Sequence, residues 1–172
     1  MKIEVERLSK QFKIRNLEES DIPQILELCK KNPKYYRHCP PEVSSETIKK
    51  DMTILPPNKT LEEKYYIGFF ESRDLVAVME LIDGYPNEET AFIGFFMMNM
   101  HFQGQGIGSK IVTEVCEYLS EQFSKVRLGY VKGNEQSEHF WLKNSFKKTG
   151  VESKQENYTV VVLERDLKGR EQ

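Results

Sequence analysis

The residues with the clearest potential for chemistry are the six at 103–108, which read Gln-Gly-Gln-Gly-Ile-Gly. They follow an apolar run at 91–98 that is typical of a buried strand, and they precede a run that is typical of an amphipathic helix. Glycine gives the backbone access to positive φ and lets a ligand approach the main chain closely. The free N–H groups of the first helical turn lie at the positive end of the helix dipole. The segment therefore predicts a loop that binds a phosphate or pyrophosphate group.

The spacing of these glycines excludes two common phosphate-binding motifs. A dinucleotide-binding fingerprint would need a third glycine at position 109, where the chain has Ser109. A P-loop would need the order Gly-Lys-Ser/Thr, where the chain has Gly-Ser-Lys. The pattern that remains is Gln/Arg-x-x-Gly-x-Gly, supplied by Gln103, Gly106 and Gly108. A tight turn that caps the helix without any ligand is the alternative interpretation.

At these residues the chain resembles the GNAT superfamily of N-acetyltransferases, in which this loop cradles the pyrophosphate of acetyl-coenzyme A. A second similarity lies downstream, where Asn134, Phe140-Trp141 and Ser145-Phe146 match the spacing of the family's Asn, Phe-Tyr and Gly-Phe. Two positions depart from the family pattern. Trp141 stands where a tyrosine often protonates the leaving thiolate, and Ser145 stands in place of a glycine.

The resemblance implies that acetyl-CoA is the cosubstrate and that no metal is required. In the family the fourth and fifth strands separate, and the pantetheine arm pairs with the backbone of the fourth strand. The implied cofactor-binding residues are Phe96, Met97, Met98, Gln103, Gly104, Gln105, Gly106, Ile107, Gly108, Ser109, Asn134, Phe140 and Trp141.

Several of these residues have a structural alternative. The methionines at 97–98 are suited to filling a core. Asn134 is favoured as the N-cap of a helix that begins near Glu135, and the aromatic pair at 140–141 can pack on the sheet. Ligand binding is compatible with these roles, because the backbone at 97–98 would make the cofactor contacts and one Asn can serve both purposes.

The general base is less well defined by the sequence. Glu80 lies late in an expected strand, beside the implied acetyl site, and burial among its apolar neighbours would raise its pKa. An outward-facing strand residue is the alternative interpretation of Glu80. Tyr85 and Tyr130 are further catalytic candidates, and His101 is a lesser one just before the glycine loop.

The acceptor site is expected between the first two helices and the loops at 35–41 and 83–89. Tyrosines there can form an aromatic wall for an amine, and acids can attract a cation; the candidates are Tyr35, Tyr36, Tyr65, Tyr66, Tyr85, Asp83, Glu88 and Glu89. Charged residues of this kind are also common on solvated surfaces. The acceptor therefore stays open between a small-molecule amine and a peptide amine.

The bulk properties restrict the class of protein. A length of 172 residues predicts a single domain over 1–172, with loose ends at 1–10 and 168–172. A net charge of −2 argues against a nucleic-acid-binding protein. The N-terminus lacks the apolar stretch of a signal peptide, and no apolar run reaches transmembrane length.

The cysteines indicate the compartment. Cys29, Cys39 and Cys116 are scattered and show no Cys-x-x-Cys spacing, which is typical of reduced thiols. We therefore expect a cytoplasmic protein without membrane association, either a monomer or a homodimer.

The pattern of apolar residues and chain breakers predicts an α/β protein. Strands are expected near 12–14 and at 64–71, 75–82, 91–98, 125–131, 146–153 and 158–164, and helices at 18–31, 44–55, 107–119 and 135–144. The strand at 91–98 is expected to be buried on both faces. Residues 35–41 are expected to form an irregular loop, and 1–10 an extra strand or a frayed end. The resemblance supplies the topology, a GNAT-like mixed twisted β-sheet with helices on both faces.

Together these features predict an acetyl-CoA-dependent N-acetyltransferase that transfers an acetyl group directly to a primary amine in a ternary complex. The alternative is a catalytically silent acyl-CoA-binding or regulatory domain, favoured by Trp141 and by the absence of an obvious base. A nucleotide-binding module unrelated to CoA is a third, weaker interpretation.

Overall fold

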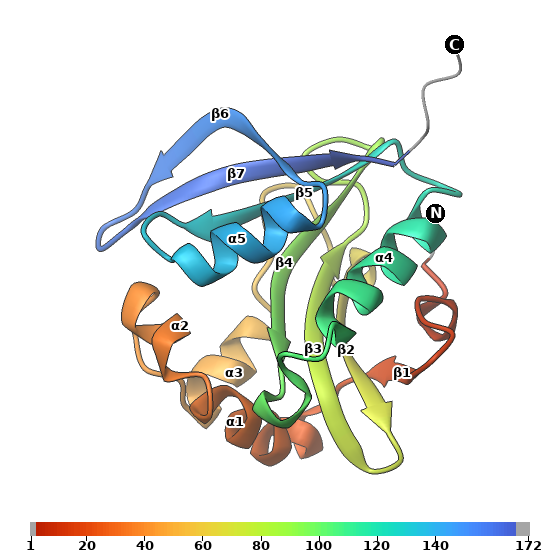
Figure 1. Cartoon of the computed structure of the whole chain (residues 1–172), viewed down its shortest axis with the longest axis vertical. Coiled ribbons are helices and arrows are strands. Elements are labelled where there is room, and N and C mark those ends of the chain that lie inside the picture. Colours follow the sequence, from red (N-terminus) through yellow and green to blue (C-terminus); the bar gives the residue numbers. More distant parts are fainter. Residues whose placement is uncertain (1–2, 168–172) are drawn as a thin grey trace.

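A computed structural model describes residues 3–167 of the chain. Its centre is one seven-stranded sheet with the strand order β1-β2-β3-β4-β5-β7-β6 (Figure 1). The β4–β5 pair is parallel, and every other neighbouring pair in this sheet is antiparallel. The strands are β1 (Lys13–Asn16), β2 (Lys64–Glu71), β3 (Asp74–Ile82), β4 (Thr90–Met98), β5 (Lys125–Val131), β6 (Lys147–Lys154) and β7 (Thr159–Asp166).

Residues 3–167 form five α-helices, which pack on the two faces of this sheet. They are α1 (Ile22–Lys30), α2 (Pro33–His38), α3 (Ser45–Asp51), α4 (Ile107–Leu119) and α5 (Glu135–Lys143). One apolar cluster joins α4 and α5 to one face, and a second cluster joins α1 and α3 to the other. The predicted fold class, a mixed sheet with helices on both faces, is confirmed.

The helix after the glycine loop forms as its apolar spacing predicts. Ile111, Val112, Val115 and Leu119 are all buried against the sheet. The helix begins directly after Gly106, whose φ of 76° sets the chain in the left-handed region. A residue with a side chain pays a steric cost in that conformation, so glycine is the residue suited to this turn.

The sheet opens between β4 and β5. Their parallel ladder runs from the Thr90–Lys125 pair to the Ile93–Leu128 pair and stops there in the described chain. Beyond that point β5 continues along β7, while β4 continues along β3, so the two strands diverge (Figure 1). The expectation that the whole run at 91–98 is buried on both faces is therefore wrong: Phe95 and Phe96 are partly exposed, and Gly94 is exposed.

A β-bulge marks the point where β4 leaves β5. In the β3–β4 ladder, Glu80 pairs with Phe95 and Leu81 pairs with Ile93, so Gly94 is the extra residue of β4. A bulge bends its strand and increases the local twist. The bend at Gly94 thus coincides with the inner end of the opening.

The segment at 35–41 is not wholly irregular, because α2 occupies its first part. Proline disfavours helical backbone in the residue before it, and α1 ends at Lys30, ahead of Asn32-Pro33. Pro33 then begins a new helix at its first position, where the missing N–H is not needed. Pro33 therefore lies just after the end of α1 and is the first residue of α2.

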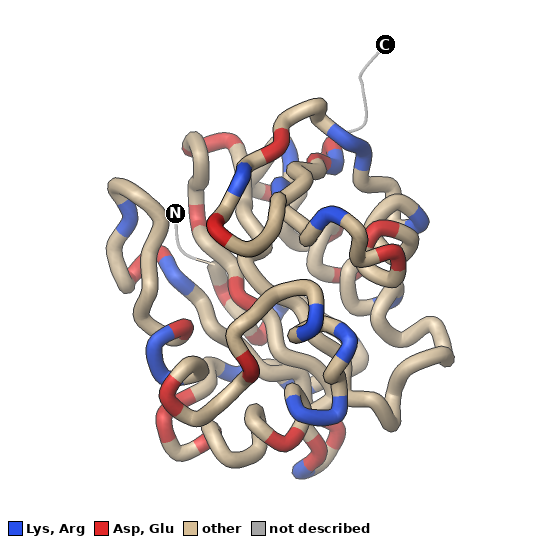
Figure 2. The backbone as a smooth tube through the Cα atoms, turned by 90° about the vertical axis from the view of Figure 1, so that its left-hand side faces the viewer, with Lys and Arg blue, Asp and Glu red and all other residues tan. Residues whose placement is uncertain are grey.

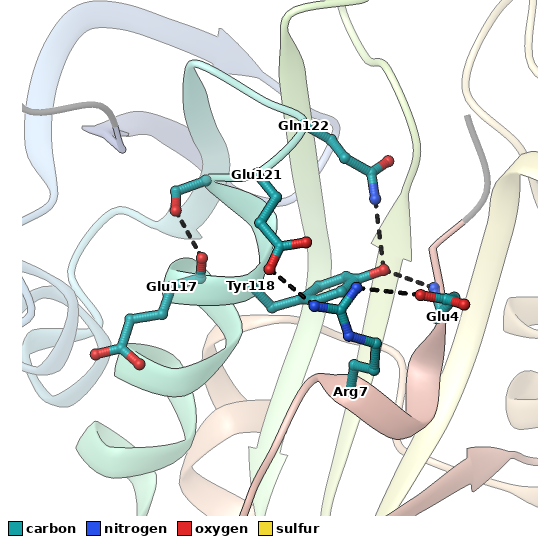
Figure 3. A network of polar contacts seen from close by, with 7 residues as sticks. Glu4, Arg7, Glu117, Tyr118, Glu121 and Gln122 are labelled. Atoms are coloured by element: carbon teal, nitrogen blue, oxygen red, sulfur yellow. Dashed lines mark hydrogen bonds and ion pairs between the residues drawn. The ribbon is translucent and has the colours of Figure 1, made fainter.

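The N-terminal segment is neither a strand nor a frayed end over its described residues. Val5–Arg7 form a 3-10 helix, and Ile3, Val5 and Leu8 are buried. Figure 3 shows how Arg7 reaches the end of α4: its guanidinium donates to Glu121 over 2.8 Å and lies 4.9 Å from the centre of the Tyr118 ring. The expected loose tail at 168–172 lies outside the described residues. No described helix is long and apolar enough to cross a membrane.

Candidate active site

A cleft with a volume of 770 Å³ lies in the opening between β4 and β5. One wall is the last part of β4 together with the glycine loop and the first turn of α4. The other wall is the first part of α5, from Asn134 onward, and the mouth is bordered by α2 and the residues just before it. The sequence motifs at 103–108 and 134–141 therefore face a shared cavity although they lie in different parts of the chain.

The backbone of β4 offers one edge to this cleft, and on that edge the Met98 carbonyl already accepts from the side chains of Asn32 and Gln103. The N–H of Asn99 donates to the carbonyl of Val76 over 2.8 Å, so the backbone at Asn99, and by alternation at Met97, faces β3. The backbone groups of Phe96 and Met98 then point the other way, toward the gap left by β5. An extended ligand that carries amide groups would meet these positions as it would meet the edge of a sheet.

The glycine loop leaves its backbone open to a ligand. Gly104 and Gly106 both have φ of 76°, and a Cβ atom on either would meet no protein atom within 4 Å. Gly108 is different, because a Cβ atom there would lie 3.3 Å from the ring of Phe140. The first two glycines thus satisfy the backbone conformation, and the third lets α4 lie close to α5.

The side chain of Gln103 is held by hydrogen bonds to other protein groups and is not directed at solvent. Its Nε2 donates to Oδ1 of Asn32 over 2.8 Å and to the carbonyl of Met98 over 3.0 Å. Asn32 also donates to the carbonyls of Leu28 and Met98. The side chains of Gln103 and Asn32 therefore fasten the start of the glycine loop to the end of β4 and the α1–α2 junction. No local pattern in the sequence points to Asn32, because its partner lies 71 positions away.

The aromatic residues of the second motif form a packed group against β4. The Phe140 ring stacks on the Phe96 ring at 6.0 Å between centroids, and Trp141 contacts Phe96, Phe140 and Phe146 at 5.9, 4.9 and 5.2 Å. Trp141 is buried, whereas Phe140 is partly exposed in the cleft. Trp141 thus packs in the core and also borders the cleft wall.

The remaining predicted cofactor residues have mixed surroundings. Asn134 caps α5, where its Oδ1 accepts from the N–H of Ser137 over 3.2 Å, and it also lines the cleft. The hydroxyl of Ser109 accepts from the buried side chain of Asn144. Gln105 is exposed and donates to the carbonyl of His101, while Ile107 packs on the core.

Glu80 lies on the face of the sheet that carries α1 and α3, outside the walls of the cleft. Oε1 of Glu80 is 3.4 Å from Nζ of Lys64, and the two side chains are 14% and 1% exposed. Burial raises the pKa of the Glu80 carboxyl, and the adjacent Lys64 ammonium opposes that shift. The same carboxylate touches the bulge of β4, since a Cβ atom on Gly94 would lie 2.7 Å from Oε1.

The two tyrosine candidates for catalysis do not line the cleft. Tyr85 lies in the turn before β4, and its ring packs edge-on against Phe92 at 5.2 Å. Tyr130 is buried in β5; burial raises the pKa of its hydroxyl, Glu138 adds to that shift, and Lys148 opposes it. A tyrosine that does line the cleft is Tyr35, from α2.

The expected aromatic wall is divided between the two faces of the sheet. Tyr35, Tyr36 and Tyr66 belong to the cluster under α1 and α3, and Tyr35 packs against Phe95 at 5.8 Å. Tyr65 belongs to the opposite cluster, where its hydroxyl accepts from the N–H of Ile3. Tyr35, Tyr36 and Tyr66 are therefore the tyrosines that share a face with Glu80.

Basic side chains border the mouth of the cleft, which the sequence did not indicate. Lys31, Lys34 and Arg37 contribute from the α1–α2 region, and Lys143 contributes from α5. Figure 2 looks on to the side of the molecule where α2 lies and shows several Lys and Arg positions in the foreground. This rim is suited to attract a ligand with several negative charges. Among the described residues, no group of three His, Cys, Asp or Glu is placed to hold a metal ion.

A family model of the acetyltransferase (GNAT) family matches residues 25–146. The chain belongs to this family. The match takes in the glycine loop, the β4–β5 opening and the aromatic residues of α5, so the resemblance expected from those motifs is confirmed and the protein is an acetyltransferase of the GNAT class. Among curated proteins, none matches the sequence at a significant level.

Solved structures share the fold of this GNAT protein at low sequence identity. An acetyltransferase from Salmonella typhimurium that modifies the N-terminal serine of ribosomal protein L7/L12 is 20% identical, with a TM-score of 0.73 over 94% of this chain and 98% of that one. A spermidine N-acetyltransferase chimera of Vibrio cholerae SpeG and hSSAT is 17% identical, with a TM-score of 0.68 over 92% and 96%. The PaiA N-acetyltransferase of Thermoplasma acidophilum, in complex with coenzyme A, is 18% identical, with a TM-score of 0.64 over 91% and 99%.

Proposed function

We propose that this protein transfers the acetyl group of acetyl-CoA directly to a primary amine while both substrates are bound. The observation that carries the proposal is the cleft between β4 and β5, which ends at a positive-φ glycine loop on the N-terminus of α4. A cleft of 770 Å³ is within the range of cofactor sites. The coenzyme A complex of a protein with the same fold supports this assignment.

Each part of the cleft suits one part of acetyl-CoA. The N–H groups of the glycine loop and of the first turn of α4 would bind the pyrophosphate. The basic rim formed by Lys31, Lys34, Arg37 and Lys143 would add attraction for the phosphates. The backbone of Phe96 and the N–H of Met98 would pair with the amides of the pantetheine arm, and Asn134 and Phe140 would border that arm on the other side.

The acceptor would approach from the face that carries α1 and α3. Glu80, Tyr35, Tyr36 and Tyr66 share this face, and an ammonium group is attracted both by a carboxylate and by aromatic rings. The acceptor is therefore a primary amine of a small molecule or of a peptide. Proteins with this fold act on a protein N-terminus and on spermidine, which supports the class of acceptor without choosing a member.

The reaction would begin with removal of a proton from the ammonium by Glu80, directly or through a water molecule. The amine nitrogen then bonds to the thioester carbon, and a backbone N–H of β4 stabilises the oxyanion, a contribution of roughly 3 kcal/mol per donor. The C–S bond breaks as the carbonyl re-forms, and the thiolate takes a proton from water or from the amide nitrogen as it forms. Trp141 supplies no acidic proton for this last step.

A thiol-release assay with acetyl-CoA and a panel of amines tests the proposal. The panel contains spermidine, free amino acids and short peptides with different N-terminal residues. We expect acetyl-CoA binding by calorimetry and release of CoA with at least one acceptor, with the acetylated product identified by mass spectrometry. Tighter binding of NAD or ATP than of acetyl-CoA would contradict the proposal.

A silent acyl-CoA-binding domain is the second candidate. Two observations favour it. Trp141, a buried aromatic residue, occupies the position of the family's tyrosine. The two tyrosines considered for catalysis, Tyr85 and Tyr130, lie outside the cleft walls. Acetyl-CoA binding without turnover on any amine of the panel would support it.

A further inference from the structure

The carboxylate of Glu80 is held in one place by two residues on neighbouring strands. Lys64, the first residue of β2, contacts it through Nζ at 3.4 Å. Gly94, the bulge residue of β4, lies against it on the other side, where a Cβ atom would come within 2.7 Å of Oε1. The Glu80 carboxylate therefore lies between the buried ammonium group of Lys64 and the main chain of Gly94, which carries no side chain.

Lys64 is fixed in turn by the end of α3. Its Nζ donates to the carbonyl of Asp51 and to the carbonyl of Ile54, in addition to its contact with Glu80. Two of the three N–H donors of the ammonium are therefore used by main-chain carbonyls, and Glu80 supplies the opposite charge. The Lys64 side chain is 1% exposed, so this buried charge is both hydrogen-bonded and paired.

Gly94 connects this arrangement to the cleft. It is the extra residue at the point where β4 leaves β5, and it precedes by two residues Phe96, which lines the cleft. Two residues of extended strand span about 7 Å. Gly94 is also exposed, and the Glu80 side chain beside it is 14% exposed, so the carboxylate is not fully closed off from solvent.

We propose that Lys64 and Gly94 are positioning residues that hold the carboxylate of Glu80 beside the β4 bulge, on the face from which the acceptor amine would approach the cleft. The inference rests on the proposed function, and it adds two residues that act through Glu80. Lys64 supplies the charge that keeps the carboxylate ionised and in one rotamer. Gly94 supplies the space, because any other residue at the bulge displaces the carboxylate.

The first test is Gly94→Ala, measured on an acceptor that the wild-type protein acetylates. The added methyl group meets the far end of a flexible side chain, so the fold persists and the Glu80 carboxylate moves. We expect kcat to fall on the order of tenfold to a hundredfold, since a displacement of about 1 Å can cost that much, while acetyl-CoA affinity by calorimetry stays the same.

The double variant gives the control for the first test. In a Glu80→Ala background the carboxylate is gone, so Gly94→Ala should cause no further loss of kcat. Equal losses from Gly94→Ala with and without Glu80 would overturn the proposal, because they would show an effect of the methyl group on the substrate itself.

The second test is Lys64→Met, with Lys59→Met as the matched control. Lys59 pairs with Glu63 and is not among the charged groups that act on Glu80, so its loss should leave the pH profile unchanged. The groups that face Glu80 are Lys64 and Tyr66 from β2 and Asp51 from α3. Removal of the only cation in this set disfavours the ionised carboxylate, so the acidic limb of kcat/KM should move to higher pH.

If Lys64→Met does not fold, Gly94→Ala still provides the kinetic test. The double variant Lys64→Met/Glu80→Gln then removes both charges of the buried pair together. A Lys64→Met protein that folds and keeps the wild-type acidic limb would contradict the proposal. An unchanged kcat for Gly94→Ala would also contradict it. Failure of the proposed function is distinguishable, because the wild-type protein itself would then show no turnover.

Discussion

The side chain of Gln103 donates to that of Asn32 over 2.8 Å and so joins the glycine loop to the short connection between α1 and α2. The same Gln103 amide holds the last carbonyl of β4, at Met98. Two walls of the cleft, the α1–α2 junction and the glycine loop, are thus fixed relative to one another before any ligand binds. The Gln of the motif is in this way a structural support for the loop.

Loss of this support should affect both stability and cofactor affinity. Gln103→Ala leaves Oδ1 of Asn32 without this donor, and an unsatisfied part-buried polar group costs about 1–3 kcal/mol of unfolding free energy. We also expect weaker acetyl-CoA binding because the loop is less well ordered. Gln105→Ala is the matched control for stability, since Gln105 is exposed in the same loop. Chemical denaturation and calorimetry measure the two effects, and equal stability of both variants would show that the Asn32 contact is unimportant.

A side chain at Gly106 should obstruct the pyrophosphate. Its φ of 76° would strain a β-branched residue, so the informative change is Gly106→Asn, because asparagine tolerates the left-handed region. The matched control is Gly150→Asn on β6, where φ is 88° and a Cβ atom also meets no protein atom within 4 Å. We expect similar small losses of stability in both variants. Acetyl-CoA affinity should fall at least tenfold in Gly106→Asn alone, and an unchanged affinity there would refute the cradle.

Asn134 should have separable roles in stability and in binding. Asn134→Ala removes the cap of α5 and should cost about 1 kcal/mol of unfolding free energy. Asn134→Asp keeps an oxygen that can cap the helix but lacks the amide N–H groups. We expect Asn134→Asp to recover the stability and to bind acetyl-CoA as weakly as Asn134→Ala. Full recovery of binding in Asn134→Asp would assign the residue to capping alone.

Trp141 should behave as a packing residue and not as a proton donor. Trp141→Phe removes volume from the group formed with Phe96, Phe140 and Phe146, so unfolding free energy should fall by roughly 1–3 kcal/mol. The kcat should stay within a few-fold of wild type, and Trp141→Tyr tests whether a hydroxyl raises it. Leu142→Ala is the control on the same helix, because that side chain is 40% exposed. A loss of kcat of several hundredfold in a stable Trp141→Phe protein would reverse this assignment.

Two of the cysteines should be inert in the folded protein. Burial raises the pKa of the Cys29 and Cys116 thiols to about 11, so little thiolate, the reactive form, exists at pH 8. Cys39 is partly exposed at the end of α2. We expect a thiol reagent at pH 8 to modify Cys39 first and the other two after denaturation. Rapid labelling of Cys29 in the native state would show that α1 opens locally.

The parts of the fold that follow from local pattern were predictable. The apolar stripe of α4 and the turn before it depend on residues that are close together in the sequence. The same is true of the hairpins β2–β3 and β6–β7. α2 was missed because the proline that ends one helix can also begin another, and a single sequence does not separate the two uses. The burial of the N-terminal segment was missed for a different reason: Arg7 and its partner Glu121 lie 114 positions apart.

The candidate site was predictable to the extent that it is made of main chain. The glycine loop, the backbone at 96–98 and the cap at Asn134 depend on local spacing, and the structure places all three on the cleft. The contact of Lys64 with Glu80 depends on strand register, and that of Asn32 with Gln103 depends on how α1 meets the end of β4. Such contacts come from packing between segments that are distant in the sequence, and the hydrophobic periodicity within one segment does not predict them.

The short ladder between β4 and β5 also bears on how the chain acquires its structure. Strands β2, β3 and β4 pair with their neighbours in sequence, as do β6 and β7, but Thr90 reaches Lys125 only after the whole α4 crossover has formed. Closing a long crossover costs more chain entropy than closing a hairpin, so we expect the two groups of strands to form first and to dock late. Amide hydrogen exchange should then show lower protection in Thr90–Ile93 than in the middle of β3. The opening that admits the ligand would thus mark the last junction made during folding.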